Sequence, residues 1–481
     1  MTESKEGNCR KRDIVFLYAA AMLPMISMLS LVHQYLFSSL TGTIVYGFLI
    51  PGLFGVAVYK GVWRRGRELQ IMCIYWGWLL ITRVINGDHA LTESLDPMLS
   101  ACQMILVFLP GFLLPEKERS RLLPVLAAGV SLFYLALGAA SVYVGVTHRE
   151  LINPLDGYWI GFVMKEMRIE LLGLHPNIAG AHFMIAFCMS LYLLFRFRHP
   201  AVRIFAAVAA ATDVVVIAQT VSRNAQTCLC AAVGLAVGIC IISKMNHPGK
   251  PLRIIVLCAS ALACALLFYQ CFEPIRYGLW AIYSAEETEV SAQSANPASA
   301  EGERLVLQTL SSGNPGYGQT ALSSAGTQTH NAEESFRRDD RSYLESGRKE
   351  IYWSALKSLQ MEPRRLLLGS SWEHLMDCSH ELIREQVVHF HNDFLQALNL
   401  VGLPGFALLL LFFFFMAKTG FTILLDAGNR FALCEKMLVV PVAVFFIYVM
   451  LECVLTREYL DFRSLMFYLL CGFMTGTAKR Q

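Results

Sequence analysis

Apolar runs recur along almost the whole chain, each of roughly 17–25 residues, the length that a helix needs to cross a hydrocarbon layer about 30 Å thick. Charged residues make up only 16% of the sequence and apolar residues 55%, whereas a soluble domain has about 25% charged residues. The sequence therefore predicts an all-α polytopic membrane protein with about twelve transmembrane helices. The runs lie near residues 14–33, 42–58, 69–85, 98–114, 122–146, 174–194, 201–221, 224–243, 254–272, 396–416, 437–455 and 464–477.

Lysine and arginine are unevenly distributed among the connections between these runs. Cytoplasmic connections of membrane proteins carry an excess of these residues. If the N-terminus is cytoplasmic, the connections on its side hold 22 of the 40 basic residues, and the short connections on the other side hold 7. The remaining 11 fall in one long segment, 273–395, before the tenth run. We therefore expect a multi-pass protein of the cell membrane with cytoplasmic N- and C-termini, and 273–395 outside the cytoplasm. The net charge of only +3 gives no indication of nucleic-acid binding.

This layout divides the chain into three parts. Residues 1–272 hold about nine of the apolar runs, and residues 396–481 hold about three. The extracytoplasmic loop between them contains an insert near 284–335 that is rich in Ser, Ala, Gly, Thr and Glu. Such a composition cannot bury enough apolar area to offset the entropy of ordering, so we expect a flexible insert. The later stretch "SYLESGRKEIYWSALKSLQMEP" has apolar residues at helical spacing, which predicts a helix that ends at Pro363.

Most of the 14 cysteines lie inside apolar runs, where cysteine behaves as a small apolar residue. Cys271 and Cys378 lie at or beyond the expected outer surface. They can form a disulfide if that compartment is oxidising, and the sequence leaves this pairing open.

Three groups of polar residues lie at the expected outer ends of the runs. "LLGLHPNIAG" places His175 and Asn177 at the start of a run, where Asn and Pro are also ordinary helix-start residues. "QTVSRNAQT" places Arg223 between two runs that are joined by almost no loop. An ionisable residue there faces a cavity or a partner, or extends to the membrane interface. Arg348 in "SGRKEIYW" is the third, with an ordinary exposed arginine as the alternative.

The densest polar group is "HFHNDF", which contains His389, His391, Asn392 and Asp393 and directly precedes an apolar run. A helix cap is one interpretation, because Asn392 or Asp393 precedes the expected helix and Gln396 follows Asp393 by three residues, as in a capping box. This accounts for Asn392 and Asp393 but leaves the two histidines unexplained.

Two chemical interpretations address the histidines. A zinc site would draw on His374, Cys378 and His380 nearby, but the spacing lacks the paired ligands of a recurring zinc module, so we expect no metal. Alternatively, a histidine can accept a proton from a sugar hydroxyl at neutral pH. Arginine side chains suit a phosphate or diphosphate leaving group, because their forked donors bind it in a bidentate manner. Together these groups are typical of a glycosyl-transfer site.

At this point the sequence resembles the O-antigen ligase superfamily. "HFHNDFLQALNLVGLPG" is similar to its signature, a His-Asn pair followed by an aromatic residue, a leucine and a glycine pair about ten residues on. The stretches "LHPNIAG", "SRNAQ" and "GRKEIYWSALKSLQMEPRRLLLGSS" are similar to further family pieces in the same order, so the resemblance covers about 170–410. The chain departs from the family at Asn224, where a glycine is often found, and in the long 284–335 insert.

The resemblance implies a metal-independent, inverting glycosyltransferase without a cofactor, acting on a polyprenyl-diphosphate-linked glycan donor and an acceptor hydroxyl on a glycan or a lipid. It implies that Arg223 and Arg348 bind the diphosphate and that His391 activates the acceptor with help from His389. Asn392, Asp393, His175 and Asn177 would have supporting roles. Ligation and polymerisation of surface polysaccharide both remain open. The alternative is a transporter or flippase of lipid-linked glycans, which would need charged residues along a path through the membrane, and the apolar runs hold few.

Overall fold

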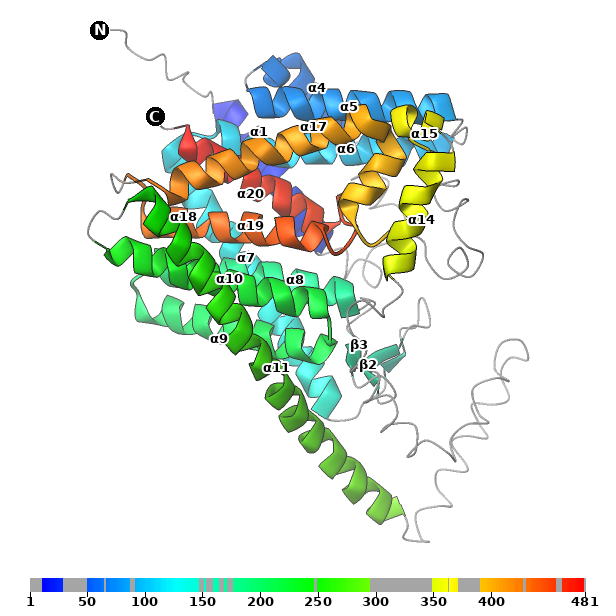
Figure 1. Cartoon of the computed structure of the whole chain (residues 1–481). Helices are drawn as coiled ribbons and strands as arrows, with labels where there is room; N and C mark the ends of the chain where they lie inside the picture. Colours follow the sequence, from blue (N-terminus) through cyan, green and yellow to red (C-terminus); the bar gives the residue numbers. More distant parts are fainter. Residues whose placement is uncertain are drawn as a thin grey trace.

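The computed structural model shows a bundle of long helices (Figure 1). It describes residues 11–28, 50–64, 66–86, 91–146, 151–152, 159–163, 168–170, 176–245, 249–294, 348–361, 363–370, 390–426, 430–455 and 461–479. The first half contains α1 (Lys11–Ala21), α4 (Ile50–Tyr59), the short 3-10 helix η2 (Val62–Arg64), α5 (Arg67–Asn86), α6 (Leu91–Leu113), α7 (Glu116–Val146), α8 (Pro176–Arg196), α9 (Pro200–Thr220) and α10 (Arg223–Lys244). The second half contains α11 (Lys250–Ser294), α14 (Arg348–Met361), α15 (Pro363–Leu368), α17 (Asp393–Leu424), α18 (Leu433–Met437), α19 (Val439–Val449) and α20 (Phe462–Ala478).

Each of the twelve predicted apolar runs overlaps one of these helices. Within the described residues, seven helices are long and apolar enough to cross a membrane, namely α5, α7, α8, α9, α10, α11 and α17. They are helical because an apolar environment leaves the main chain no hydrogen-bond partner other than itself. The prediction of a predominantly helical chain is confirmed, and these seven helices are suited to a membrane by their length and composition.

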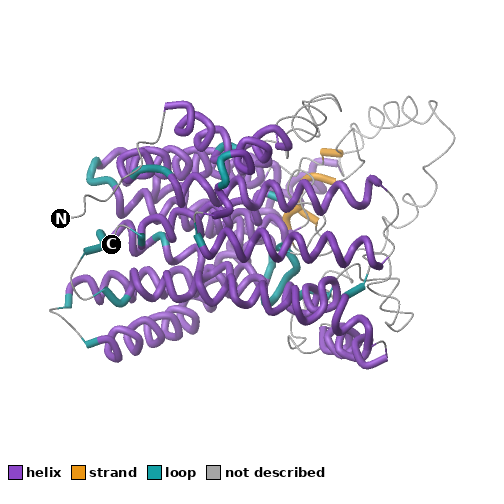
Figure 2. Tube along the Cα trace, turned by 90° about the horizontal axis from the view of Figure 1, so that it is seen from above, coloured by secondary structure: helices purple, strands orange, loops and turns teal. Residues whose placement is uncertain are grey.

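The prediction of an all-α chain misses a small antiparallel sheet between α7 and α8. Its strands are β1 (Leu151–Ile152), β2 (Trp159–Val163) and β3 (Arg168–Glu170), in the order β1-β2-β3. Ile152 pairs with Trp159, and Phe162 pairs with Ile169. The strands stand at one end of the bundle (Figure 2).

The boundary predicted for the flexible insert is wrong at its start. Helix α11 continues through 284–294 without interruption, so that it has 45 residues and a length of roughly 68 Å at about 1.5 Å per residue. Figure 1 shows its second half extending beyond the other helices. The rest of the insert, 295–335, lies outside the described residues. The helix predicted before Pro363 is confirmed as α14, and Pro363 itself is the first residue of α15, where its fixed φ and missing N–H are tolerated.

Two glycines allow α15 and α17 to approach each other at main-chain distance. Gly402 has φ +63° and kinks α17. A Cβ added there would lie 2.4 Å from the carbonyl oxygen of Leu367, and one added at Gly369 would lie 2.0 Å from that of Leu400. The indole of Trp78 on α5 donates to the carbonyl oxygen of the residue before Gly402, at 2.7 Å. This contact occupies a carbonyl next to the kink and fixes the first part of α17 against α5 and α15.

The bundle has two ends, which we call the His391 end and the Lys250 end. At the His391 end, α8, α10 and α17 begin and α5 and α19 finish. Asn86, the last residue of α5, donates there to the carbonyl oxygen of Leu368, at 3.1 Å. At the Lys250 end, the ammonium of Lys479 lies 3.0 Å from the carboxylate of Glu68, which joins the end of α20 to the start of α5. The His391 end lies to the right in Figure 1.

Candidate functional site

His391, Asn392 and Asp393 lie together where α17 begins. Asn392 is the N-cap, and its Oδ1 accepts from the main-chain N–H groups of Phe394 and Leu395, at 3.0 Å each. The predicted helix cap is therefore confirmed for Asn392. The predicted capping box is wrong in detail, because Gln396 accepts instead from the N–H of Phe390, at 3.3 Å.

The side chains next to the cap hold a second segment in place, the irregular stretch 450–455 that follows α19. The carboxylate of Asp393 accepts from the N–H groups of Val454 (2.8 Å) and Leu455 (3.0 Å). The amide of Asn392 donates to the carbonyl oxygen of Met450 at 2.8 Å. The predicted helical run 437–455 is therefore wrong in its last six residues, since α19 ends at Val449. Main-chain groups that leave a helix need other partners, and Asp393 and Asn392 supply them.

His391 forms a pair with a buried glutamate of this second segment. Its Nδ1 lies 3.0 Å from Oε2 of Glu452. The other oxygen, Oε1, accepts from the amide of Asn224 at 3.1 Å, and the same amide lies 3.2 Å from the carbonyl oxygen of Leu451. The side chain of His391 is 27% exposed and that of Glu452 only 7%. The imidazole is therefore partly accessible, while the carboxylate behind it is shielded from water.

The main chain of His391 adopts a conformation that few residues take. Its φ is +50°, in the left-handed region, where histidine is more frequent than most residues other than glycine. Such a conformation persists where surrounding contacts determine it. Here the hydroxyl of Tyr352 on α14 donates to the carbonyl oxygen of His391 at 3.3 Å, and the next N–H, that of Asn392, donates to Sγ of Cys453 at 3.1 Å. These contacts set the direction in which the imidazole leaves the chain.

The two predicted arginines begin helices that reach this cluster. Arg223 is the first residue of α10, directly after the N-cap Ser222 and directly before Asn224, which contacts Glu452. Arg348 is the first residue of α14, one helical turn before Tyr352. Segments that are far apart in the sequence therefore meet at the His391 end.

The remaining predicted residues are divided between this end and the part of the chain that is not described. Asn177 lies in the first turn of α8, and its carbonyl oxygen accepts from the hydroxyl of Tyr448 at 3.2 Å. His175 and His389 lie outside the described residues. His374, Cys378 and His380 of the zinc alternative also lie outside the described residues. For the same reason the possible disulfide between Cys271 and Cys378 lies outside them. Over the described ranges, no three His, Cys, Asp or Glu side chains are grouped so that they could hold a metal ion.

Sequence reasoning missed Glu452. It lies in "FFIYVMLECVL", inside a predicted transmembrane run, and an acidic residue in such a run is itself a sign of a functional or structural partner. Its partner His391 is 61 residues away, so spacing gives no indication of the pair. Asn224 also has a role here, because its side-chain amide donates to Glu452, and a glycine at this position would have no side chain to do so.

No protein-family model matches this sequence, and no curated protein gives a significant match to it. The geometry of the cluster itself indicates which chemistry it can support. A carboxylate next to Nδ1 favours the tautomer that carries its proton on that nitrogen. Nε2 is then left with a lone pair that can accept a proton, which is the arrangement of a general base with an orienting acid.

Proposed function

We propose that this protein is a membrane glycosyltransferase of the O-antigen ligase type. It would transfer a glycan from a polyprenyl-diphosphate donor to an acceptor hydroxyl at the outer face of the cytoplasmic membrane. The observation that carries the proposal is the pair of His391 and Glu452, at 3.0 Å, next to the starts of α10 and α14. The first residues of these two helices are Arg223 and Arg348.

In the proposed reaction, Nε2 of His391 removes the proton of the acceptor hydroxyl. The hydroxyl oxygen attacks the anomeric carbon of the donor sugar and forms the new glycosidic bond. The bond from that carbon to the diphosphate breaks on the opposite face, so the configuration is inverted. Glu452 accepts a hydrogen bond from Nδ1–H throughout, and its negative charge stabilises the imidazolium that forms.

The leaving diphosphate gains negative charge as its bond to the sugar breaks. Arg223 and Arg348 would neutralise this charge through bidentate hydrogen bonds, which makes a resident metal unnecessary in this scheme. Asn392 and Asp393 support the base by holding the main chain on both sides of the pair. His389 and His175 complete the proposal as supporting residues.

The proposal includes a membrane arrangement. We infer about twelve crossings, with both termini in the cytoplasm and 273–395 outside it. The lipid tail of a polyprenyl-linked donor lies in the bilayer and its glycan lies in water, so the reacting bond is at the boundary between them. A cluster at the ends of long apolar helices, such as the one around His391, suits a substrate of this kind.

The test uses the purified full chain, a polyprenyl-diphosphate-linked glycan and a lipid-linked acceptor. We expect His391→Ala to lower the transfer rate about 10²–10⁴-fold, as is typical for the loss of a positioned base, while donor binding is kept. His199→Ala is a matched control, because His199 is exposed at the Lys250 end and its side chain makes no capping hydrogen bond. EDTA should have no effect.

Three outcomes would contradict the proposal. One is a normal rate with His391→Ala, and a second is activity that EDTA removes and zinc restores, which would favour the metal alternative. The third is movement of the donor across a vesicle membrane without any transfer, which would favour a transporter. Supplying either a lipid acceptor or a second copy of the donor separates ligase from polymerase by the length of the product.

A further inference from the structure

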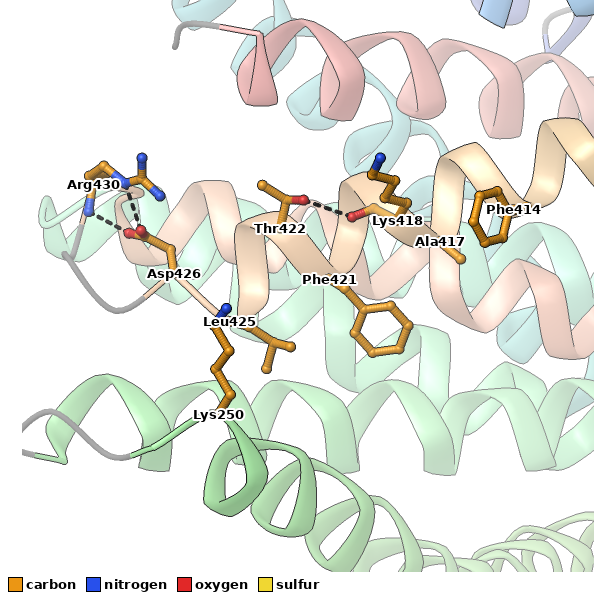
Figure 3. Close-up of a pocket in the computed structure, with 9 residues that line it drawn as sticks. All are labelled: Lys250, Phe414, Ala417, Lys418, Phe421, Thr422, Leu425, Asp426 and Arg430. Atoms are coloured by element: carbon orange, nitrogen blue, oxygen red, sulfur yellow. Dashed lines mark hydrogen bonds and ion pairs between the residues drawn. The ribbon is translucent and has the colours of Figure 1, made fainter.

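A cavity of about 780 Å³ lies at the Lys250 end, far from the candidate site. It is bounded by the start of α11, the last turns of α17 and the connection that follows α17 (Figure 3). Helix α17 separates it from His391. That helix is kinked at Gly402, and its part from Gly402 to Leu424 is roughly 33 Å long at about 1.5 Å per residue. The cavity and the candidate site therefore belong to opposite ends of the bundle.

The polar lining of the cavity carries an excess of positive charge. Its charged residues are Lys250 from α11, Lys418 from α17, Arg430, and one carboxylate, Asp426. Arg430 and Asp426 neutralise each other, with Nε and Oδ1 at 2.7 Å. Asp426 is further held because the buried Arg253 donates to its carbonyl oxygen. In the part of the chain that the structure describes, Lys250 and Lys418 have no ion-pair partner, so two positive charges remain for a ligand.

Apart from Thr422, the rest of the lining is apolar, and its two largest side chains face outward. Phe414 and Phe421 lie seven residues apart on α17, on the same face of the helix. Their exposed fractions are 62% and 52%. Large aromatic side chains on the outside of a transmembrane helix contact lipid chains. The cavity thus joins two ammonium groups to an apolar surface.

We propose that this cavity binds an anionic phospholipid, with its headgroup attracted by Lys250 and Lys418 and its acyl chains along Phe414 and Phe421. Charge complementarity selects the headgroup, because a zwitterionic lipid would bring an ammonium of its own toward the two lysines. Basic pockets between transmembrane helices bind phosphate-bearing lipid headgroups in this manner. The inference does not depend on the proposed transferase activity, since it rests on residues at the other end of α17.

The experiment measures lipid binding to the purified full chain in detergent by native mass spectrometry. The probes are phosphatidylglycerol, phosphatidylcholine and inorganic phosphate. We expect phosphatidylglycerol to bind more tightly than phosphatidylcholine. The double variant Lys250→Gln/Lys418→Gln should weaken phosphatidylglycerol binding about 30-fold, at roughly fivefold for each basic residue near the headgroups.

The control variant Arg203→Gln/Lys244→Gln removes two exposed cations from the same end but outside the cavity. We expect it to change binding less than twofold. A second double variant, Lys250→Arg/Lys418→Arg, keeps the charge and should retain most of the affinity. Equal binding of the two lipids, equal losses in the Gln variant and its control, or binding of inorganic phosphate without phosphatidylglycerol would each overturn the proposal.

Discussion

Glu452→Gln is the sharpest perturbation of the candidate site, because it removes one charge and almost no volume. The carboxylate of Glu452 lies between two donors, Nδ1 of His391 at 3.0 Å and the amide of Asn224 at 3.1 Å. A glutamine can present an oxygen to only one of them, and its own amide then faces the other donor. The negative charge that would stabilise the imidazolium is lost in either orientation.

The expected effect follows from the geometry and burial of the pair. Two unit charges about 4 Å apart interact by about 4 kcal/mol at an effective dielectric constant of about 20, and solvent reduces this because the His391 side chain is 27% exposed. A hydrogen bond to a charged group contributes about 1.5–3 kcal/mol. At about 1.4 kcal/mol per tenfold change in rate, we expect kcat per protein molecule to fall about 10- to 150-fold.

The assay is single-turnover transfer with saturating donor, normalised to the amount of folded protein. Glu68→Gln is the matched control, because Glu68 is also buried and also lies 3.0 Å from its basic partner, Lys479, but at the Lys250 end. We expect that control to lower protein abundance at most and to leave the rate per molecule unchanged. A wild-type rate for Glu452→Gln, or equal losses in the two variants, would refute the role of Glu452.

Three further predictions test other parts of the molecule. Arg223→Lys and Arg348→Lys keep the charge but lose the bidentate fork, so each should lower kcat strongly while the amount of protein in the membrane stays normal. Wild-type glycan levels in cells carrying either variant would contradict the diphosphate role. A reporter that is active only outside the cytoplasm should be active when fused near Gly326 and silent near Leu425, and the reverse pattern would overturn the topology. Gly402→Ala forces a Cβ to within 2.4 Å of a carbonyl oxygen at φ +63°. It should therefore destabilise the fold by more than the roughly 1–2 kcal/mol that the left-handed backbone conformation alone costs. An unchanged melting temperature would show that the contact between α15 and α17 can relax.

The helices were predictable from the sequence because hydropathy acts locally. A run of apolar residues specifies a helix in a membrane whatever its neighbours are. The sheet was not predictable in this way, because β1 has two residues and β3 has three, too few for an alternating pattern to be recognised. The extension of α11 through 284–294 is not evident from composition, because a stretch rich in Ser, Ala and Glu is typical of disorder although Ala and Glu also favour helices.

The candidate site was predictable only in part. A helix cap at Asn392 follows from the residues next to it, so its position could be expected from sequence. The partner of His391 depends on where α19 ends and on how 450–455 turns back toward α17. The residues next to His391 and Glu452 in the sequence indicate neither of these features. The cap interpretation assigned Gln396 to the wrong main-chain group for a similar reason. The side-chain oxygen of Gln396 accepts from the N–H of Phe390, which precedes the N-cap.

Helix α11 has a consequence for how this sequence can diverge. In the stretch of α11 that is apolar enough to cross a membrane, only 11% of the residues are buried inside the protein, against 78% in the corresponding stretch of α8. Leu262, Leu266 and Leu267 are all more than 60% exposed, so these side chains project from the bundle instead of packing inside it. Replacement of one of them by Val leaves no internal cavity. Replacement of Phe183 in α8, which is 0% exposed, by Val would leave one. During evolution α11 can therefore exchange one apolar residue for another while its hydropathy is kept. We expect the sequence of α8 to change more slowly than that of α11.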